Sequence, residues 1–187
     1  MIIFSSDNGP VLDDGYDDSA EKLVGNHKPA GIYRGGKYSA FEAGTRVPTI
    51  TYWPGVIKPG ASNQLFSQID FFASLAKLVN QKIPAGAAPD SENMLAELLG
   101  TSKKGRTYML EESFTLSLRK ENWKYISPQE KQAPDWLKNK TIESGLKPIA
   151  QLYDLKNDPG EENNLADQYP KIVMELKEEL KKIKKGH

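Results

Sequence analysis

Asp7 and Asn8 are the first residues of the chain whose side chains could bind a metal ion. They follow the apolar run Met1–Phe4, within the sequence Ser-Ser-Asp-Asn-Gly-Pro at positions 5–10. Carboxylate and amide oxygens are the donors that Ca²⁺ and Mg²⁺ prefer, and ligands gather where the strands of an α/β sheet end. Asp-Asn-Gly is also a common turn sequence, so the pair by itself indicates either a turn or part of a metal site.

A second group of polar side chains lies in the glycine-rich segment 31–37, which has the sequence Gly-Ile-Tyr-Arg-Gly-Gly-Lys. Arg34 and Lys37 supply positive charge beside glycines whose backbone can approach an anion closely. His27 precedes this segment and is one of two histidines in the chain. A solvated loop has the same composition, so the segment alone leaves an anion site and an ordinary loop open.

The elements that must position these residues begin with the apolar run at residues 1–4. Closure of such a run by polar residues and Gly-Pro predicts the end of a buried parallel strand, which needs neighbours that this chain does not supply. The alternative is an edge strand at a domain start. Further along the chain, the pattern predicts a helical turn at 17–23, a strand at 47–53, and a helix from Gln64 or Ser67 to Leu78.

The second half of the chain predicts a small α+β layer. A Pro/Ala/Gly segment at 84–89 marks the boundary, giving domains at residues 1–88 and 89–187. A helix is expected at 94–99 and an amphipathic helix from Pro170 to about Lys185. Strands are expected at 108–112, 116–119, 123–126 and 151–155. The predicted fold class is therefore α/β, followed by a subdomain with an antiparallel sheet and a C-terminal helix.

Composition excludes several classes of function. Lys+Arg and Asp+Glu are both 25, so no net charge attracts nucleic acid or an anionic membrane. The chain has no cysteine, which removes disulfides, thiolate metal sites and cysteine nucleophiles. No run approaches the roughly 18 apolar residues of a membrane-spanning helix.

Taken in order, several strings of the sequence resemble one family. They are Ser6–Pro10, the segment Arg-Gly-Gly-Lys-x-x-x-x-Glu-x-Gly-x-Arg-Val-Pro at 34–48, Tyr-Trp-Pro-Gly at 52–55, Trp-Lys-Tyr at 123–125, Leu-Tyr-Asp-Leu at 152–155, and the segment from Asp158-Pro159 to Asn164-Leu165-Ala166. Together they resemble the C-terminal portion of the type I, formylglycine-dependent sulfatases, which belong to the alkaline-phosphatase-like superfamily. The resemblance covers nearly the whole chain except residues 127–147.

The resemblance implies a partial alkaline-phosphatase-like core in residues 1–88 and an arylsulfatase-like activity on sulfated glycans or aryl sulfates. Asp7 and Asn8 match a pair of calcium ligands, and Lys37 matches the catalytic lysine that contacts the sulfate group. His27 falls where glycan-directed members carry substrate contacts. Glu42 and Arg46 also belong to the motif and are expected to hold the Lys37 loop. Complete relatives are usually periplasmic or secreted.

One departure from the family is large. The family nucleophile is a formylglycine made from Cys or Ser within Cys/Ser-x-Pro-x-Arg, and the chain contains no such string; Ser127-Pro128 has the wrong spacing. We therefore expect no turnover by the isolated chain. Calcium binding should also be weak or absent, because two protein ligands fall short of the roughly six to eight that Ca²⁺ takes.

Other interpretations remain open at this point. The chain could derive from a phosphate or phosphonate ester hydrolase of the same superfamily. It could instead be a non-catalytic module that binds a glycan or a partner chain, with Trp123, Tyr125 and Trp136 stacking on sugars, unless these rings fill the subdomain core. Self-association through the unpaired first strand is a further possibility.

Overall fold

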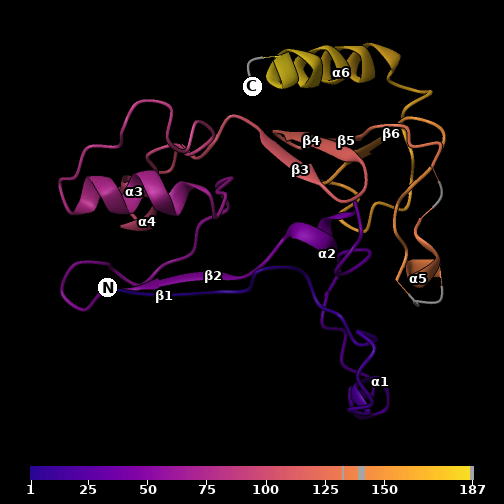
Figure 1. Cartoon of the computed structure of the whole chain (residues 1–187), viewed down its shortest axis with the longest axis horizontal. Helices are drawn as coiled ribbons and strands as arrows, with labels where there is room; N and C mark the ends of the chain where they lie inside the picture. The colour runs from indigo at the N-terminus through magenta and orange to yellow at the C-terminus, as the bar shows by residue number, and fades with distance from the viewer. Residues whose placement is uncertain (132, 139–141, 186–187) are drawn as a thin grey trace. The chain divides into compact units, whose positions relative to one another are not determined.

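The computed structural model describes residues 1–131, 133–138 and 142–185 (Figure 1). The chain forms two compact units that alternate along the sequence. The first unit consists of Met1–Ser5 and Thr49–Met109, and the second of Ser6–Pro48 and Leu110–His187. This grouping differs from the expected division into residues 1–88 and 89–187, which stays a prediction.

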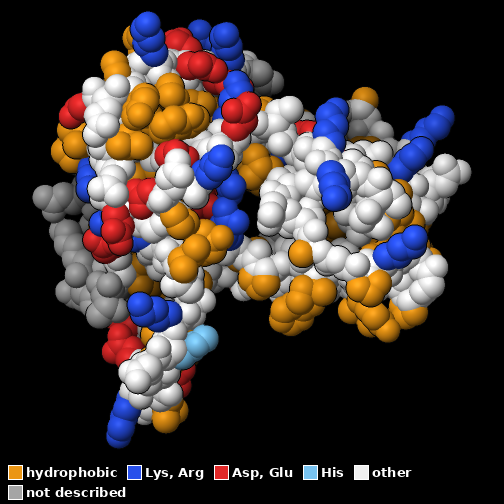
Figure 2. Space-filling view, turned by 180° about the vertical axis from the view of Figure 1, so that it is seen from behind, with side chains coloured by type: hydrophobic (Ala, Val, Ile, Leu, Met, Phe, Trp, Pro, Cys, Tyr) orange, Lys and Arg blue, Asp and Glu red, His pale blue; other side chains and the backbone are white. Residues whose placement is uncertain are grey.

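In the first unit, β1 (Ile2–Ser5) and β2 (Thr49–Tyr52) form an antiparallel pair. The expectation of a buried parallel strand at the start of the chain is therefore wrong for this structure. Ile2 lies opposite Tyr52 and Phe4 opposite Ile50, and these four side chains are 57–64% exposed. An apolar run predicts a strand but not its direction, which is set by the partner that the rest of the chain brings alongside. Hydrophobic side chains gather along this ribbon in Figure 2.

The helices of the first unit are α3 (Asp70–Leu78) and α4 (Leu95–Leu98). Helix α3 begins three residues after Ser67, the later of the two expected starts, and Asp70 turns inward in its first turn. The Asp70 carboxylate accepts hydrogen bonds from the backbone N–H groups of Ser67 and Glu92 and from Arg106 Nη1 at 2.6 Å. Asp70 is fully buried, so the pair with Arg106 anchors the helix to the segment that follows α4.

The second unit contains a four-stranded antiparallel sheet in the order β3-β4-β5-β6. The strands span Met109–Glu112, Leu116–Lys120, Trp123–Ile126 and Gln151–Asp154. Helix α6 (Pro170–Lys185) packs against β4 and β5 through its buried Leu176 and Leu180 (Figure 1). The predicted α+β layer, with an antiparallel sheet and a C-terminal helix, is confirmed.

Three short helices complete the described elements: α1 (Ala20–Leu23), α2 (Glu42–Thr45) and α5 (Asp135–Lys138). Helix α1 lies within the expected turn at 17–23, whereas α2 and α5 are too short to leave a periodic signal. A core cluster of Ala40, Phe41, Ile126 and Tyr153 fixes the segment before α2 against the sheet. Among the helices of the described ranges, none is long and apolar enough to cross a membrane.

Candidate functional site

Asp7, Asn8 and Lys37 line one cavity of about 570 Å³ in the second unit. The other residues of the lining come from the loop after Lys37, from α2, and from the end of β3 with the turn that follows it: Tyr38, Ser39, Gly44, Thr45, Glu112, Ser113 and Phe114. Two carboxylate side chains, an amide and an ammonium group therefore surround the same space. Such a lining suits a ligand that carries negative charge together with a hard cation.

Backbone contacts hold the two loops of this cavity together. Gly9 N donates to Gly44 O at 3.0 Å, and Lys37 N donates to Pro10 O at 2.9 Å. The approach is so close that a Cβ atom on Gly9 would lie 1.6 Å from Ala43 O. Only glycine fits there, since any side chain would overlap the facing backbone.

The Lys37 loop also folds back on itself. Ser39 N donates to Gly36 O and Ala43 N to Arg34 O, both at 3.0 Å. A Cβ atom on Gly44 would lie 2.0 Å from Ser39 O. The loop and α2 therefore form one compact turn, which fixes where the Lys37 side chain leaves the backbone.

Side chains around the cavity are ordered by neighbouring groups. Asn8 Nδ2 donates to Gly9 O at 2.9 Å, which fixes the orientation of the Asn8 amide. Lys37 Nζ lies 5.3 Å from the centre of the Tyr38 ring, a favourable cation–π distance. Trp136 meets Tyr38 edge-on at 4.8 Å and Phe114 at 6.1 Å, so this half-exposed ring lies beside the cavity.

The other two aromatic candidates pack within the protein. Tyr125 is 1% exposed and belongs to the core. Trp123 packs against Tyr169 with ring centres 5.2 Å apart. For Tyr125 the core interpretation is therefore the right one, because a buried ring cannot stack on a sugar.

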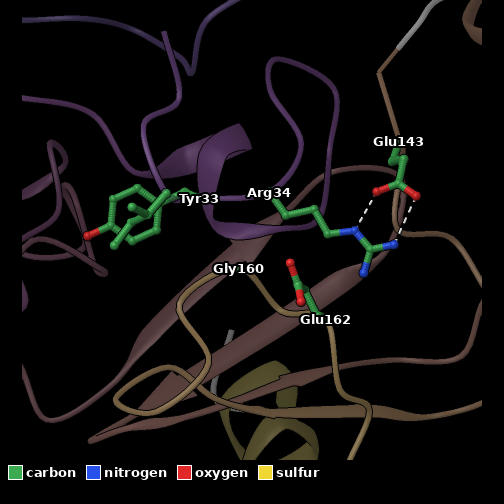
Figure 3. Close-up of a pocket in the computed structure, with 6 residues that line it drawn as sticks. Tyr33, Arg34, Glu143, Gly160 and Glu162 are labelled. Atoms are coloured by element: carbon green, nitrogen blue, oxygen red, sulfur yellow. Dashed lines mark hydrogen bonds and ion pairs between the residues drawn. The ribbon is translucent and has the colours of Figure 1, made fainter. Parts of the chain in front are cut away.

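Neither His27 nor Arg34 is among the residues that line this cavity. His27 is exposed on the loop after α1, where its backbone N–H donates to Val24 O at 3.1 Å. Arg34 lines a second cavity of about 450 Å³, together with Tyr33 and Glu162 (Figure 3). The structure thus separates Arg34 from Lys37, which the sequence had grouped as one anion clamp.

Each nitrogen atom of the Arg34 guanidinium group already has a hydrogen-bond partner. Its Nε and Nη2 donate to the two carboxylate oxygens of Glu143, and Nη1 donates to Glu161 O at 2.6 Å (Figure 3). The guanidinium group lies over the Phe41 ring at 4.3 Å. The hydrogen bonds to Glu143 raise the pKa of Arg34 and lower that of Glu143. With its charge neutralised, Arg34 anchors the loop rather than offering a site to an anion.

Glu42, at the start of α2, is the centre of a buried group of charges. Its carboxylate accepts from Arg46 Nη2 at 2.7 Å, from Arg119 Nη1 at 3.1 Å and from Lys124 Nζ at 3.1 Å. Burial acts to raise the pKa of Glu42, but Lys124, Arg119 and Arg46 outweigh it and lower the pKa to about 2. Glu42 therefore stays ionised, and the expectation that Glu42 and Arg46 hold the Lys37 loop agrees with these contacts.

Lys124, on β5, is one member of this group whose role sequence reasoning missed. It is 0% exposed, and its Nζ also lies 3.4 Å from Glu111 and 3.7 Å from Glu161. Burial acts to lower the pKa of Lys124, but the three carboxylates raise it above its ordinary value. A lysine between Trp123 and Tyr125 in a strand indicates an outward charge, so only the fold reveals that it points inward.

Glu161, beyond β6, completes the group. Burial raises its pKa to about 7, against the opposing effect of Lys124. Its Oε2 accepts the Glu42 backbone N–H at 2.6 Å, whereas its buried Oε1 makes no hydrogen bond within the described residues. In the sequence, Glu161 lies within the string that begins at Asp158-Pro159. That string indicated the family but not the role of Glu161.

The oxygen donors of Asp7 and Asn8 fit Ca²⁺ in kind but not in number. Within residues 1–131, 133–138 and 142–185, no group of three or more His, Cys, Asp or Glu side chains could hold a metal ion. Two side chains supply only part of the roughly six to eight oxygen ligands that calcium takes. Further ligands would have to come from water, the substrate or another chain segment.

The mixed α/β structure, with its antiparallel sheets and C-terminal helix, has the fold of the sulfatases of the alkaline-phosphatase-like superfamily. A sulfatase structure from Bacteroides thetaiotaomicron, described with the metabolism of multiple glycosaminoglycans, matches 98% of the chain with a TM-score of 0.92 and 49% identity. The structure of Ps i-CgsB shares the fold, with a TM-score of 0.68 and 20% identity over 96% of the chain. The match covers 38% and 35% of those two chains.

Sequence comparisons lead to the same family. Residues 1–81 match the sulfatase family model. An N-acetylgalactosamine-6-O-sulfatase from Bacteroides thetaiotaomicron is 50% identical over 98% of the chain, and human arylsulfatase A is 28% identical over 95% of it. The chain belongs to the sulfatase family, and it spans 36% of the length of each of these relatives.

Proposed function

We propose that this chain contributes part of the active site of a sulfuric ester hydrolase. Lys37 binds the oxygens of the sulfate group, and Asp7 and Asn8 hold a calcium ion beside it. The observation that carries the proposal is that these three side chains line one cavity, although about 30 residues of chain separate Asn8 from Lys37.

The chemistry assigned to Lys37 is electrostatic. Its ammonium group donates hydrogen bonds to the sulfate oxygens and stabilises the negative charge that grows as the ester bond breaks. The hydrogen bonds from Lys37 N to Pro10 O and from Ser39 N to Gly36 O hold the lysine backbone, and the Tyr38 ring lies beside Lys37 Nζ, so little reorganisation is needed when the anion binds. A bound calcium ion would supply Lewis-acid polarisation and orientation of the sulfate group.

The proposed substrate is a sulfated glycan, and 6-O-sulfated N-acetylgalactosamine is the first to test. The support is the 50% identity to an N-acetylgalactosamine-6-O-sulfatase over 98% of this chain. His27 does not line the cavity, so we propose it only as a contact for a more distant part of such a glycan. Trp136, edge-on to Tyr38, is closer to the space where a sugar ring would lie.

We further propose that the isolated chain does not hydrolyse sulfate esters. The family's covalent mechanism needs a formylglycine, and neither Cys/Ser-x-Pro-x-Arg nor any cysteine occurs here. Without the nucleophile no sulfated enzyme intermediate forms. Binding of the anion is therefore the property by which this chain alone can be tested.

The test is a titration of the chain with sodium sulfate, followed by the NMR signals of the lysine side chains. Lys37→Ala should weaken sulfate binding by roughly tenfold to 100-fold, as expected when a charged hydrogen bond is lost. Lys58→Ala, which removes an exposed lysine of the first unit, is the control and should have no effect. Equal sulfate affinity in the Lys37→Ala variant would refute the assignment.

The same titration with inorganic phosphate separates two classes of hydrolase. Tighter binding of phosphate than of sulfate at Lys37 would favour a phosphate or phosphonate ester hydrolase over a sulfatase. Hydrolysis of an aryl sulfate by the pure chain, abolished by Lys37→Ala, would overturn the proposal that it is inactive.

A further inference from the structure

We propose that Lys124 and Glu161, which lie far from Lys37 in the sequence, are positioning residues that hold the Lys37 loop in its binding geometry. The functional part of this inference rests on the proposed sulfate site. The structural part, that these two residues fix the loop, stands by itself and is tested separately below.

Glu161 contacts the Lys37 loop on both sides of the lysine. Its carbonyl oxygen accepts a hydrogen bond from Arg34 Nη1 at 2.6 Å, and its carboxylate Oε2 accepts the Glu42 backbone N–H at 2.6 Å. Arg34 precedes Lys37 by three residues and Glu42 follows it by five. One residue therefore clamps both ends of the segment that carries the sulfate-binding lysine.

The conformation of Glu161 suits this clamp. Its backbone has φ 51°, a left-handed value that is uncommon for a residue with a side chain. Its N–H donates to Asp158 O at 3.1 Å, which closes a turn after Asp158-Pro159. Strain of this kind persists only where surrounding contacts determine it, and here those contacts are the two ends of the Lys37 loop.

Lys124 supplies the charge that makes the clamp stable. Its Nζ lies 3.1 Å from Glu42 Oε1 and 3.7 Å from Glu161 Oε1, and all three residues are at most 2% exposed. A single buried cation therefore links the start of α2 to the Glu161 turn through strand β5. Removing it would leave Glu42 with Arg46 and Arg119 but would take from the buried Glu161 the cation beside it, so the Glu161 carboxylate would move or take up a proton.

Backbone hydrogen bonds connect the segment that begins at Glu42 to the wall of the cavity. Helix α2 starts at Glu42 and contains Gly44, whose carbonyl oxygen accepts the Gly9 N–H at 3.0 Å. Lys37 N in turn donates to Pro10 O at 2.9 Å. Movement of α2 therefore shifts the Asp7–Asn8 loop relative to Lys37, although neither Lys124 nor Glu161 lines the cavity.

The experiment compares Glu161→Ala with Glu161→Gln in the full chain. Alanine removes the acceptor for the Glu42 N–H, whereas glutamine keeps an oxygen at the same position. Amide hydrogen exchange at Gly9 and Lys37 should accelerate by about tenfold or more in Glu161→Ala, a ratio that corresponds to about 1.4 kcal/mol. Glu161→Gln should restore most of the protection, and sulfate affinity should follow the same order.

Lys124→Met tests the ionic half of the clamp, with Lys120→Met as the matched control. Lys120 belongs to the neighbouring strand β4 but pairs with Glu179 on α6 at 2.7 Å. Lys124→Met should accelerate amide hydrogen exchange at Gly9 and Lys37, and Lys120→Met should leave it unchanged. If Lys124→Met fails to fold, the pair of Glu161 variants decides the question alone.

Two results would overturn the inference. One is wild-type exchange at Gly9 and Lys37 in Glu161→Ala; the other is an equal acceleration at Leu176 and Leu180 of α6, which would show a global loss of stability. Failure of the wild-type chain to bind sulfate would refute the proposed function instead. In that case the exchange data would still decide whether Glu161 and Lys124 fix the loop.

Discussion

The contact between Gly9 and α2 allows a sharp prediction about how the cavity is built. In Gly9→Ala the new Cβ atom would start 1.6 Å from Ala43 O and 2.7 Å from Ala43 C. A real Cβ atom essentially never comes within 3.0 Å of such a neighbour, so the two segments must separate by about 1.4 Å. Both partners are backbone, and no side chain can rotate away to relieve the overlap.

The separation has two costs. It stretches the 3.0 Å hydrogen bond from Gly9 N to Gly44 O beyond bonding range, and it opens a packed contact. Overpacking typically costs about 1–3 kcal/mol, and a buried donor left without its partner about 1–3 kcal/mol more. Because the loop can relax in part, we expect a loss of about 2–4 kcal/mol in the free energy of unfolding.

Urea unfolding of the full chain measures this loss. The matched control is Gly60→Ala, since a Cβ atom on Gly60 would meet nothing within 4 Å and Gly60 does not have a positive φ. The control should change the free energy of unfolding by no more than about 0.5 kcal/mol. Sulfate binding should weaken in Gly9→Ala and stay unchanged in Gly60→Ala.

An unfolding midpoint for Gly9→Ala equal to that of the wild type would refute the reasoning. It would mean that the Asp7–Asn8 loop and α2 do not lie in contact. A destabilised variant with unchanged sulfate affinity would instead show that the contact supports the fold without positioning the site.

Three further predictions concern charge and the apolar ribbon. The pKa of Glu161 is raised from 4.5 to about 7, so between these two pH values the folded chain binds more protons than the unfolded chain. The contribution of Glu161 to the free energy of unfolding is therefore complete below pH 4.5 and falls by on the order of 3 kcal/mol as the pH rises through 7. Glu42, with its pKa lowered to about 2, contributes stability above pH 4.5 that is lost as the pH falls toward 2; urea unfolding across pH 2–8 should show both effects. Arg106→Met should cost about 3–5 kcal/mol in urea unfolding, because it leaves the fully buried Asp70 without its cation. Phe4→Ser should reduce any self-association measured by sedimentation velocity, because Phe4 is 62% exposed on the apolar face of the β1–β2 ribbon.

The pH prediction and the sedimentation prediction each have a control. Glu161→Gln should remove the fall in the free energy of unfolding toward neutral pH. The loss of stability at acid pH, which is due to Glu42, should remain. An unchanged slope in that variant would assign the pH dependence to other groups. Leu23→Ser, which changes a 77% exposed leucine of the second unit, should not alter sedimentation. Equal effects of Phe4→Ser and Leu23→Ser would exclude the ribbon as the associating surface.

Elements with a local pattern were predictable from the sequence. The strand at Trp123–Ile126 and the helix at Pro170–Lys185 have the bounds that alternation and the apolar stripe predicted. Both patterns repeat within a few residues, so no distant contact is needed to define them. The motif strings also gave the family and placed Asp7, Asn8 and Lys37 together as candidates, a grouping that stays a proposal until binding is measured.

Other features depend on contacts that no local pattern contains. The direction of β1 depends on β2, which follows more than 40 residues later. The pairing of Arg34 with Glu143 joins residues 109 positions apart, and it withdraws Arg34 from the anion site that its neighbours indicate. A short stretch of sequence shows the type of each residue, but the residue that neutralises a charge lies elsewhere in the chain.

The sequence by itself therefore determined the family, the elements of the small α+β layer and the residue types of the proposed sulfate and calcium site. Only the tertiary structure decided that Lys124 points inward to Glu42, across 82 residues of sequence. The physical reason is that burying a charge is favourable only when an opposite charge is already in place. That condition is met by the fold as a whole and cannot be read from either residue alone.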